Sequence, residues 1–156
     1  MNKWDKYFLN IAHESSKNST CIRRQVGAVI VKNNCIISTG YNGAPSKVTH
    51  CADRGGCIRQ KLNIASGERH ELCYGAHAEA NAIFSASKNG VNVNGATLYC
   101  TTFPCSQCAK GIINSGIKEV KYTEDYNDQL SKILFEESGV ICTKLLKEDH
   151  IWIIFL

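Results

Sequence analysis

Two short motifs in the second half of the chain combine residue types that can do chemistry together. The first is HAE at 77–79 and the second is PCSQC at 104–108. Histidine nitrogen and cysteine sulfur are ligands that zinc prefers, and a catalytic zinc has three protein ligands with its fourth tetrahedral position open to water. The two motifs therefore predict a zinc site whose ligands are His77, Cys105 and Cys108.

Glu79 is the candidate for proton transfer at this site. A histidine and a glutamate two apart on a helix point in different directions, so His77 and Glu79 are not expected to bind one ion together. His77 can instead hold the metal while Glu79 reaches the water on it. Zinc lowers the pKa of that water toward neutrality, and a nearby carboxylate can take its proton and pass it to a substrate. We therefore expect Glu79 to act as a general acid and base.

Each motif alone also fits other kinds of site. A C-x-x-C pair occurs in redox couples and in structural zinc half-sites, and Cys100 is the nearest spare ligand for a closed structural site. A buried thiol is the more common explanation for a cysteine in a strand. A structural site also has no need of Glu79. Together, in this order, the two motifs match the H-x-E…P-C-x-x-C signature of zinc-dependent nucleobase deaminases, which favours a catalytic site.

Helices and strands alternate around the two motifs. Hydrophobic periodicity predicts helices over 3–16, 77–90, 105–116 and 128–139. Strands are predicted over 26–32, 35–43, 96–101, 119–123 and 140–146. The first two strands, joined by Asn33-Asn34, form a hairpin. Each motif begins a helix. At the start of the second helix, the helix dipole stabilises the thiolates of the cysteine pair. The alternation in the second half predicts an α/β fold with parallel strands and helices on both faces of the sheet.

Composition places these elements in a single domain over 1–156. The chain has 44% hydrophobic residues, enough for a core, and a net charge of +4 from scattered lysines and arginines, which argues against a nucleic-acid partner. The N-terminus lacks the apolar segment of a secretory leader, and the longest apolar run, IWIIFL at 151–156, is too short to span a bilayer. The nine cysteines then indicate metal ligands and buried thiols in the cytoplasm rather than a disulfide framework.

Three segments resemble the deoxycytidylate (dCMP) deaminases of the cytidine deaminase-like superfamily: VGAVIVKNNCIISTGYNGAP, GAHAEANAI and TLYCTTFPCSQCAKGIINSGI. The resemblance runs from about Cys21 to Tyr126 and implies a three-layer α/β/α fold around a mixed five-stranded sheet. It implies zinc-dependent deamination of dCMP to dUMP and ammonia, feeding thymidylate synthesis. The zinc signature alone covers several deaminases, including those of cytidine, cytosine and tRNA adenosine. GYNGAP and the cysteine-bearing insert at about 44–73 favour dCMP.

The resemblance also assigns roles to individual residues. It makes His77, Cys105 and Cys108 the zinc ligands and Glu79 the proton shuttle. Two further positions are matched to substrate binding, the sugar at Asn42 and the pyrimidine carbonyl at the backbone of Ala78. Members of the family form homo-oligomers, often hexamers, and many are activated by dCTP and inhibited by dTTP. Where many relatives carry a basic residue shortly before HAE, this chain has Tyr74, which leaves Arg24 and Lys88 as basic candidates for the phosphate.

The insert raises the question of a second metal. Residues 44–72 show no sustained periodicity, and a long irregular segment in a small domain is usually functional. Some relatives hold a second, structural zinc in this region, and the matching positions are Cys21, Cys51 and His70, with Cys73 or Cys57 as the fourth ligand. Alternatively these cysteines are free thiols. A metal is favoured because the segment lacks the apolar residues of a core and needs another stabiliser.

Two other functions remain open at this point. One is a zinc deaminase acting on a base in nucleic acid, which would need basic and aromatic residues clustered beside the pocket. The other is a zinc module without catalytic activity, which would have no use for Glu79. The sequence shows no such basic and aromatic cluster, and it does contain Glu79. Deamination of a free nucleotide is therefore the prediction.

Overall fold

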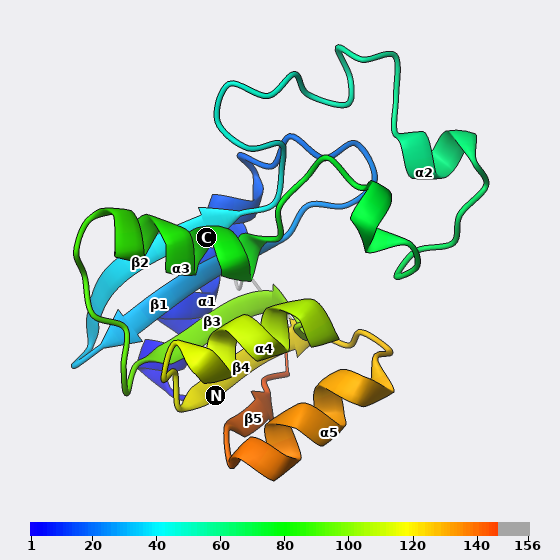
Figure 1. The fold of residues 1–156 in the computed structure, drawn as a ribbon. Helices are drawn as coiled ribbons and strands as arrows, with labels where there is room; N and C mark the ends of the chain where they lie inside the picture. The colour runs from blue at the N-terminus through cyan, green and yellow to red at the C-terminus, as the bar shows by residue number, and fades with distance from the viewer. Residues whose placement is uncertain (147–156) are drawn as a thin grey trace, which may run out of the picture.

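Five strands form one mixed sheet in the computed structural model, which describes residues 1–146 (Figure 1). They are β1 (Gly27–Lys32), β2 (Cys35–Tyr41), β3 (Thr97–Thr102), β4 (Glu119–Glu124) and β5 (Ile141–Lys144). The sheet order is β2-β1-β3-β4-β5. β1 pairs antiparallel with β2 and β3, whereas β3, β4 and β5 run parallel. The predicted mixed five-stranded sheet is therefore confirmed.

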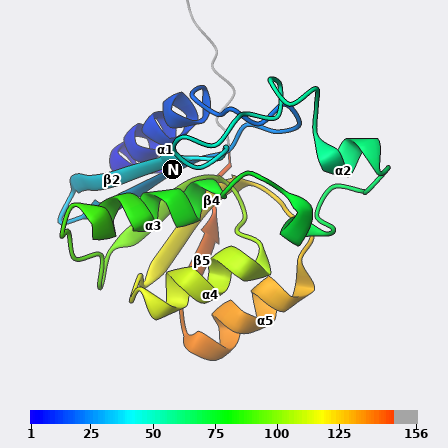
Figure 2. The same cartoon turned by 45° about the horizontal axis from the view of Figure 1, so that its top comes forward.

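Helices cover both faces of this sheet, as expected (Figure 2). They are α1 (Lys3–Ser16), α2 (Ile58–Lys61), α3 (Ala78–Lys88), α4 (Ser106–Asn114) and α5 (Gln129–Ser138), with a 3-10 turn, η1 (His70–Leu72). α1 packs on one face against Val29, Val31 and Tyr99. The other face, which includes Ala28 and Ile30, is covered by α3, α4 and α5.

The helices of the second half, α4 and α5, lie on the same face of the sheet, whereas the alternation of elements predicts helices on both faces. The chain passes from β3 through α4 to β4 and through α5 to β5, each time to the next strand in the same direction. Right-handed crossovers in one direction place both helices on the same side of a parallel sheet. The three-layer arrangement therefore depends on α1, which comes from the first part of the chain.

The predicted hairpin forms where the two asparagines stand. Asn33 and Asn34 have φ of 52° and 58°, the left-handed values that a two-residue turn between twisted strands requires. Asparagine tolerates this conformation better than most residues.

The insert at 44–73 contains only two short elements, α2 and η1, and extends beyond the edge of the sheet (Figure 1). The absence of sustained periodicity in this stretch is matched by its mostly irregular backbone. IWIIFL at 151–156 lies outside the described residues. Within 1–146, no helix has the length and apolar character needed to cross a membrane.

Candidate active site

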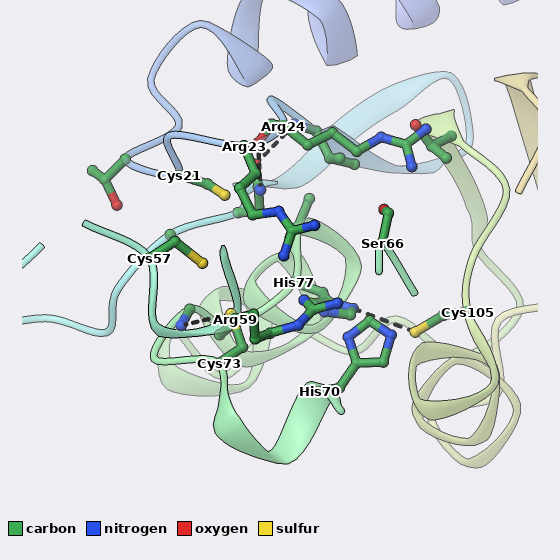
Figure 3. A pocket seen from close by; sticks show the side chains of 18 of the residues that line it. Cys21, Arg23, Arg24, Cys57, Arg59, Ser66, His70, Cys73, His77 and Cys105 are labelled. Atoms are coloured by element: carbon green, nitrogen blue, oxygen red, sulfur yellow. Dashed lines mark hydrogen bonds between the residues drawn. The ribbon is translucent and has the colours of Figure 1, made fainter. Parts of the chain in front are cut away.

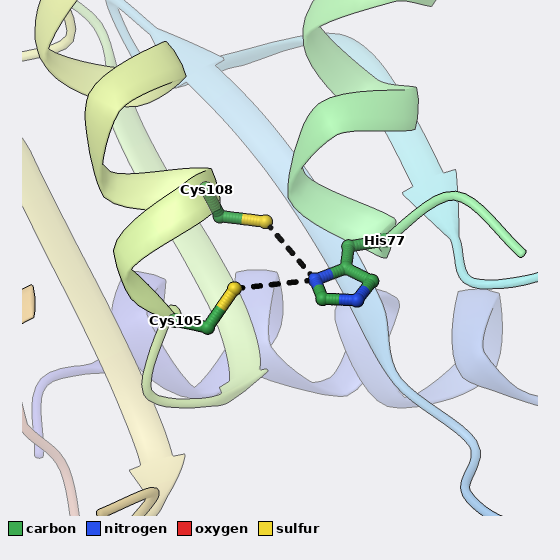
Figure 4. Close-up of side chains that lie close together, drawn as sticks. All are labelled: His77, Cys105 and Cys108. Carbon is green, nitrogen blue, oxygen red and sulfur yellow. Dashed lines mark hydrogen bonds between the residues drawn. The ribbon is translucent and has the colours of Figure 1, made fainter. Parts of the chain in front are cut away.

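The three predicted zinc ligands converge at the starts of two helices. His77 is the residue before α3, Cys105 is the residue before α4, and Cys108 lies in the first turn of α4. Nδ1 of His77 lies 3.3 Å from Sγ of Cys105 and 3.4 Å from Sγ of Cys108 (Figure 4). The three ligand atoms all lie within 4.8 Å of one another, the only such group of three found in residues 1–146.

Close packing against β2 fixes the start of α3. A Cβ added to Gly40 would lie 2.2 Å from the carbonyl oxygen of Ala78, so only glycine lets the strand approach the helix this closely. Just beyond β2, Gly43 and Ala76 exchange two backbone hydrogen bonds of 3.1 and 2.8 Å. His77 follows Ala76 directly, and its position is therefore set by the sheet rather than by a free loop.

The start of α4 is held by a side chain from the next helix. Asp128 caps α5 by accepting a 3.0 Å hydrogen bond from the Ser131 N–H, and its other oxygen accepts a 2.8 Å bond from the Ser106 N–H. The Ser131 hydroxyl donates a 2.7 Å bond to the carbonyl of Pro104. These bonds fix the residues on either side of Cys105, a role for Asp128 that the sequence motifs did not indicate.

The donor set fits a zinc ion. Hydrogen bonds from Cys108 and with His77 lower the pKa of the Cys105 thiol to about 4, whereas the bond with Cys105 raises the pKa of Cys108. Both thiols are buried, and the low pKa of Cys105 favours the thiolate form in which cysteine binds a metal. With the His77 imidazole, the two sulfur atoms make up the donor set of a Cys₂His zinc site.

Glu79 lies beside this ligand set without being part of it. Its side chain is only 5% exposed, and burial raises the pKa of its carboxyl group. It hydrogen-bonds to Cys108 and lines the same cavity as His77. A buried carboxyl with a raised pKa exchanges protons more readily near neutral pH than an exposed one, as a general acid and base requires.

The two predicted substrate-binding residues also line this cavity. Ala78 is fully buried at the first position of α3. The Asn42 side chain bridges backbone groups, accepting from the Val26 N–H at 2.8 Å and donating to the Arg24 carbonyl at 2.8 Å. Asn42 therefore has a structural role that sequence reasoning missed.

The residues predicted for a second zinc are not gathered as the first three are. In the described part of the chain, no three of Cys21, Cys51, His70 and Cys73 bring ligand atoms within 4.8 Å of one another. His70 lies in η1 with its ring 5.0 Å from that of His77, and its Nε2 is 3.3 Å from the Tyr126 hydroxyl. Its neighbours are therefore those of the first site rather than the cysteines of the insert.

Four cysteines line the same cavity, although within residues 1–146 no three of their sulfur atoms lie within 4.8 Å of one another. Burial, followed by the neighbouring thiols of Cys57, Cys73 and Cys21, raises the pKa of Cys51. All four line the cavity, and Figure 3 shows Cys21, Cys57 and Cys73 across it from Cys105. Cys57 thus lies on the same side of the cavity as Cys21 and Cys73, whereas His70 lies beside His77.

The basic residues near the cavity differ from those expected. Lys88 ends α3 away from the cavity, and Arg24 lines it but lies 3.7 Å from the carboxylate of Glu124. Two other arginines, Arg23 and Arg59, extend into the cavity (Figure 3). Arg59 lies in α2, within the insert, and no motif pointed to it.

Comparison with known proteins identifies the family. Residues 2–124 match the model of the cytidine and deoxycytidylate deaminase zinc-binding region. This chain belongs to that family. The predicted family and its zinc cofactor are thereby confirmed, and His77, Cys105 and Cys108 form a histidine–cysteine–cysteine triad typical of the catalytic zinc in this family.

Two curated members of the family show how similar its proteins are to this chain. The deoxycytidylate deaminase of Schizosaccharomyces pombe is 42% identical over 138 residues, which cover 88% of this chain and 42% of that protein. ComE operon protein 2 of Bacillus subtilis is 43% identical over 149 residues, covering 95% of this chain and 74% of that protein. The match thus spans less than half the length of the yeast protein.

Solved structures of the family confirm the fold. The dCMP deaminase of cyanophage S-TIM5, crystallised with dCMP and dUMP, has a TM-score of 0.77 and 29% identity. The superposition covers 93% of this chain and 99% of that one. The cytidine deaminase-like fold implied by the resemblance is therefore correct.

Proposed function

We propose that this chain catalyses the zinc-dependent hydrolytic deamination of dCMP to dUMP and ammonia, supplying dUMP for thymidylate synthesis. The observation that carries the proposal is the buried Glu79 carboxyl beside the converging His77, Cys105 and Cys108. It is supported by the cyanophage relative, whose crystals contain dCMP and dUMP, and by the name of the yeast relative. ComE operon protein 2 is as similar in sequence, and its name states no substrate.

In the proposed reaction, water replaces the amino group at C4 of the pyrimidine. When bound by His77, Cys105 and Cys108, zinc would lower the pKa of a water molecule toward neutrality. As the oxygen of the attacking water bonds to C4, Glu79 takes one proton from that water. Glu79 then gives this proton to N3. It then moves the second water proton to the amino group, and the C4–N bond breaks to release ammonia. The backbone N–H of Ala78, which has no partner within the helix, would hold the pyrimidine carbonyl.

The choice of substrate is the first test. The zinc-loaded protein is expected to deaminate dCMP with a higher kcat/KM than deoxycytidine, cytidine or cytosine, because the cavity contains cationic side chains that these neutral compounds cannot use. Ammonia release, measured on each compound, on single-stranded DNA and on tRNA under the same conditions, checks this. Faster deamination of the DNA or of tRNA would replace the proposal with a nucleic-acid editing enzyme.

A second zinc remains part of the proposal, with a revised ligand set. We expect it to bind among Cys21, Cys51, Cys57 and Cys73, four thiols that line one side of the cavity. Such a metal would join the residues before β1 to the insert, and its binding energy would stabilise the folded chain.

Replacing Cys51 by serine is therefore expected to lower the zinc content from two ions per chain to one and to increase hydrogen exchange in 44–72. Cys35→Ser is the matched control, because Cys35 is exposed at the start of β2 and lies outside both groups. Elemental analysis of protein purified without chelator gives the answer. One zinc per chain in the unmodified protein would show that these cysteines are ordinary thiols.

Assembly and regulation remain predictions from the resemblance: a homo-oligomer, often a hexamer in the family, and control by dCTP and dTTP. A cytoplasmic location remains a prediction from the cysteine content and the N-terminal sequence.

A further inference from the structure

Unpartnered polar atoms are concentrated in one place in this molecule. Across residues 1–146, four buried side-chain nitrogen or oxygen atoms lack a hydrogen-bond partner: Nη1 of Arg23, Nε of Arg59, Nδ1 of His70 and Oγ1 of Thr102. All four residues line the cavity beside Glu79. Buried polar groups are otherwise almost always satisfied, so their collection around one cavity points to a polar ligand that belongs there.

Two of these atoms belong to guanidinium groups that have no carboxylate partner. Within the described residues, neither Arg23 nor Arg59 forms an ion pair with an aspartate or glutamate. Arg59 is only 7% exposed. A buried cation without a counter-charge is costly, because it has lost its hydration without gaining an anion. An anionic ligand would supply the missing charge.

The insert holds both guanidinium groups in place. Nη2 of Arg23 donates to the carbonyl of Ile64 at 3.3 Å, and Nη2 of Arg59 donates to the carbonyl of Ala65 at 3.2 Å. Neighbouring carbonyls of one loop therefore orient the two side chains, and each retains an unpartnered N–H. Arg23 also hydrogen-bonds to the thiol of Cys57, so Arg59 is the arginine more fully available to a ligand.

Arg24 provides the contrast within the same cavity. Its guanidinium lies 3.7 Å from the Glu124 carboxylate and over the ring of Tyr126, so its charge is already compensated. Arg24 and Lys88 were the basic candidates that the sequence offered for the phosphate. The charge of Arg24 is compensated by Glu124, and Lys88 does not line the cavity. The uncompensated positive charge comes from Arg23 and Arg59.

We propose that Arg59, assisted by Arg23, binds the 5′-phosphate of the substrate and makes the site selective for a nucleoside monophosphate over the free nucleoside. Guanidinium groups match phosphate oxygens with paired N–H donors, and such charge-assisted bonds are strong. The proposal deepens the proposed function and rests on it. It assigns the insert a specificity role, because the insert carries Arg59 and orients both arginines.

Binding measurements separate phosphate recognition from catalysis. Calorimetric titrations of the zinc-loaded Glu79→Gln protein with dCMP and with deoxycytidine measure affinity without turnover. Adding Arg59→Gln is expected to weaken dCMP binding by about 10- to 100-fold, the effect of losing hydrogen bonds to a charged group. The affinity for deoxycytidine is expected to change by less than about 2-fold, since it has no phosphate for Arg59 to bind.

Arg54→Gln is the matched control. Arg54 belongs to the same insert and lies over the Tyr74 ring at 4.2 Å, and it does not line the cavity. Its replacement is expected to leave both affinities unchanged. If Arg59→Gln does not fold, Arg23→Gln provides the same comparison, and a selective loss of dCMP affinity is again expected.

The outcomes distinguish this proposal from the proposed function. One outcome is that the unmodified protein releases ammonia from dCMP while Arg59→Gln lowers the affinities for dCMP and deoxycytidine equally, or changes neither affinity. In that case phosphate recognition by Arg59 is wrong and the proposed activity stands. An unchanged dCMP affinity in the Arg23→Gln protein would likewise overturn the part assigned to Arg23. If no ammonia is released from dCMP by the unmodified protein, the proposed function itself fails.

Discussion

Replacing Glu79 by glutamine is expected to reduce kcat for dCMP by at least about 10⁴-fold while zinc content and fold are retained. General acids and bases typically contribute about 10²- to 10⁴-fold, and Glu79 is assigned several proton transfers in one turnover. Glutamine has nearly the same shape and cannot accept or release those protons. Steady-state ammonia release, measured alongside zinc content and circular dichroism, checks this expectation.

The control for this variant is Glu68→Gln, which removes an exposed carboxylate from the insert. It is expected to have nearly full activity. If the zinc-loaded Glu79→Gln protein turned over dCMP within about 10-fold of the unmodified enzyme, Glu79 could not be the proton shuttle.

Loss of a zinc ligand is expected to have an effect of similar size by a different route. Cys108→Ala removes one of the two thiolates from a buried site, and the remaining His77 and Cys105 cannot complete the coordination of a catalytic zinc. The protein should lose the catalytic zinc and all measurable activity. Its melting temperature should also fall, because metal binding contributes to folding stability.

A chelator experiment on the unmodified protein complements this variant. Removal of the metal should abolish ammonia release, and added Zn²⁺ should restore it, whereas added Zn²⁺ should not restore activity to Cys108→Ala. Cys35→Ala, at an exposed thiol, serves as the control. Activity that persisted in metal-free protein would contradict a zinc-dependent mechanism.

The sequence predicted the elements that rely on local patterns. The helix at Lys3–Ser16 matched its predicted range, and the other predicted elements agreed within a few residues, whereas the two short elements of the insert, α2 and η1, were not predicted. The hairpin followed from two asparagines suited to left-handed backbone conformations. The ligand triad was predictable because the two motifs begin the helices that precede and follow one buried strand, β3, along the chain. Short connections of this kind keep the two helix starts close to the same sheet.

Features that depend on tertiary contacts could not be predicted in the same way. Asp128 is 22 residues from Ser106, the residue whose N–H it binds, and no motif links the two. Arg59 lies in a four-residue helix within irregular backbone, where no periodicity indicates which side chains turn inward. His70 was grouped with the cysteines by matching it to relatives that hold a second zinc, whereas the fold places it beside His77.

The most direct test of the proposed reaction is an analysis of the products formed in isotopically labelled water. Zinc-loaded protein incubated with dCMP in H₂¹⁸O should yield one dUMP and one ammonia for each dCMP consumed, with one ¹⁸O atom at C4 of the dUMP by mass spectrometry. Failure to form dUMP, or dUMP formed without label from the solvent, would contradict hydrolytic deamination of dCMP by this chain.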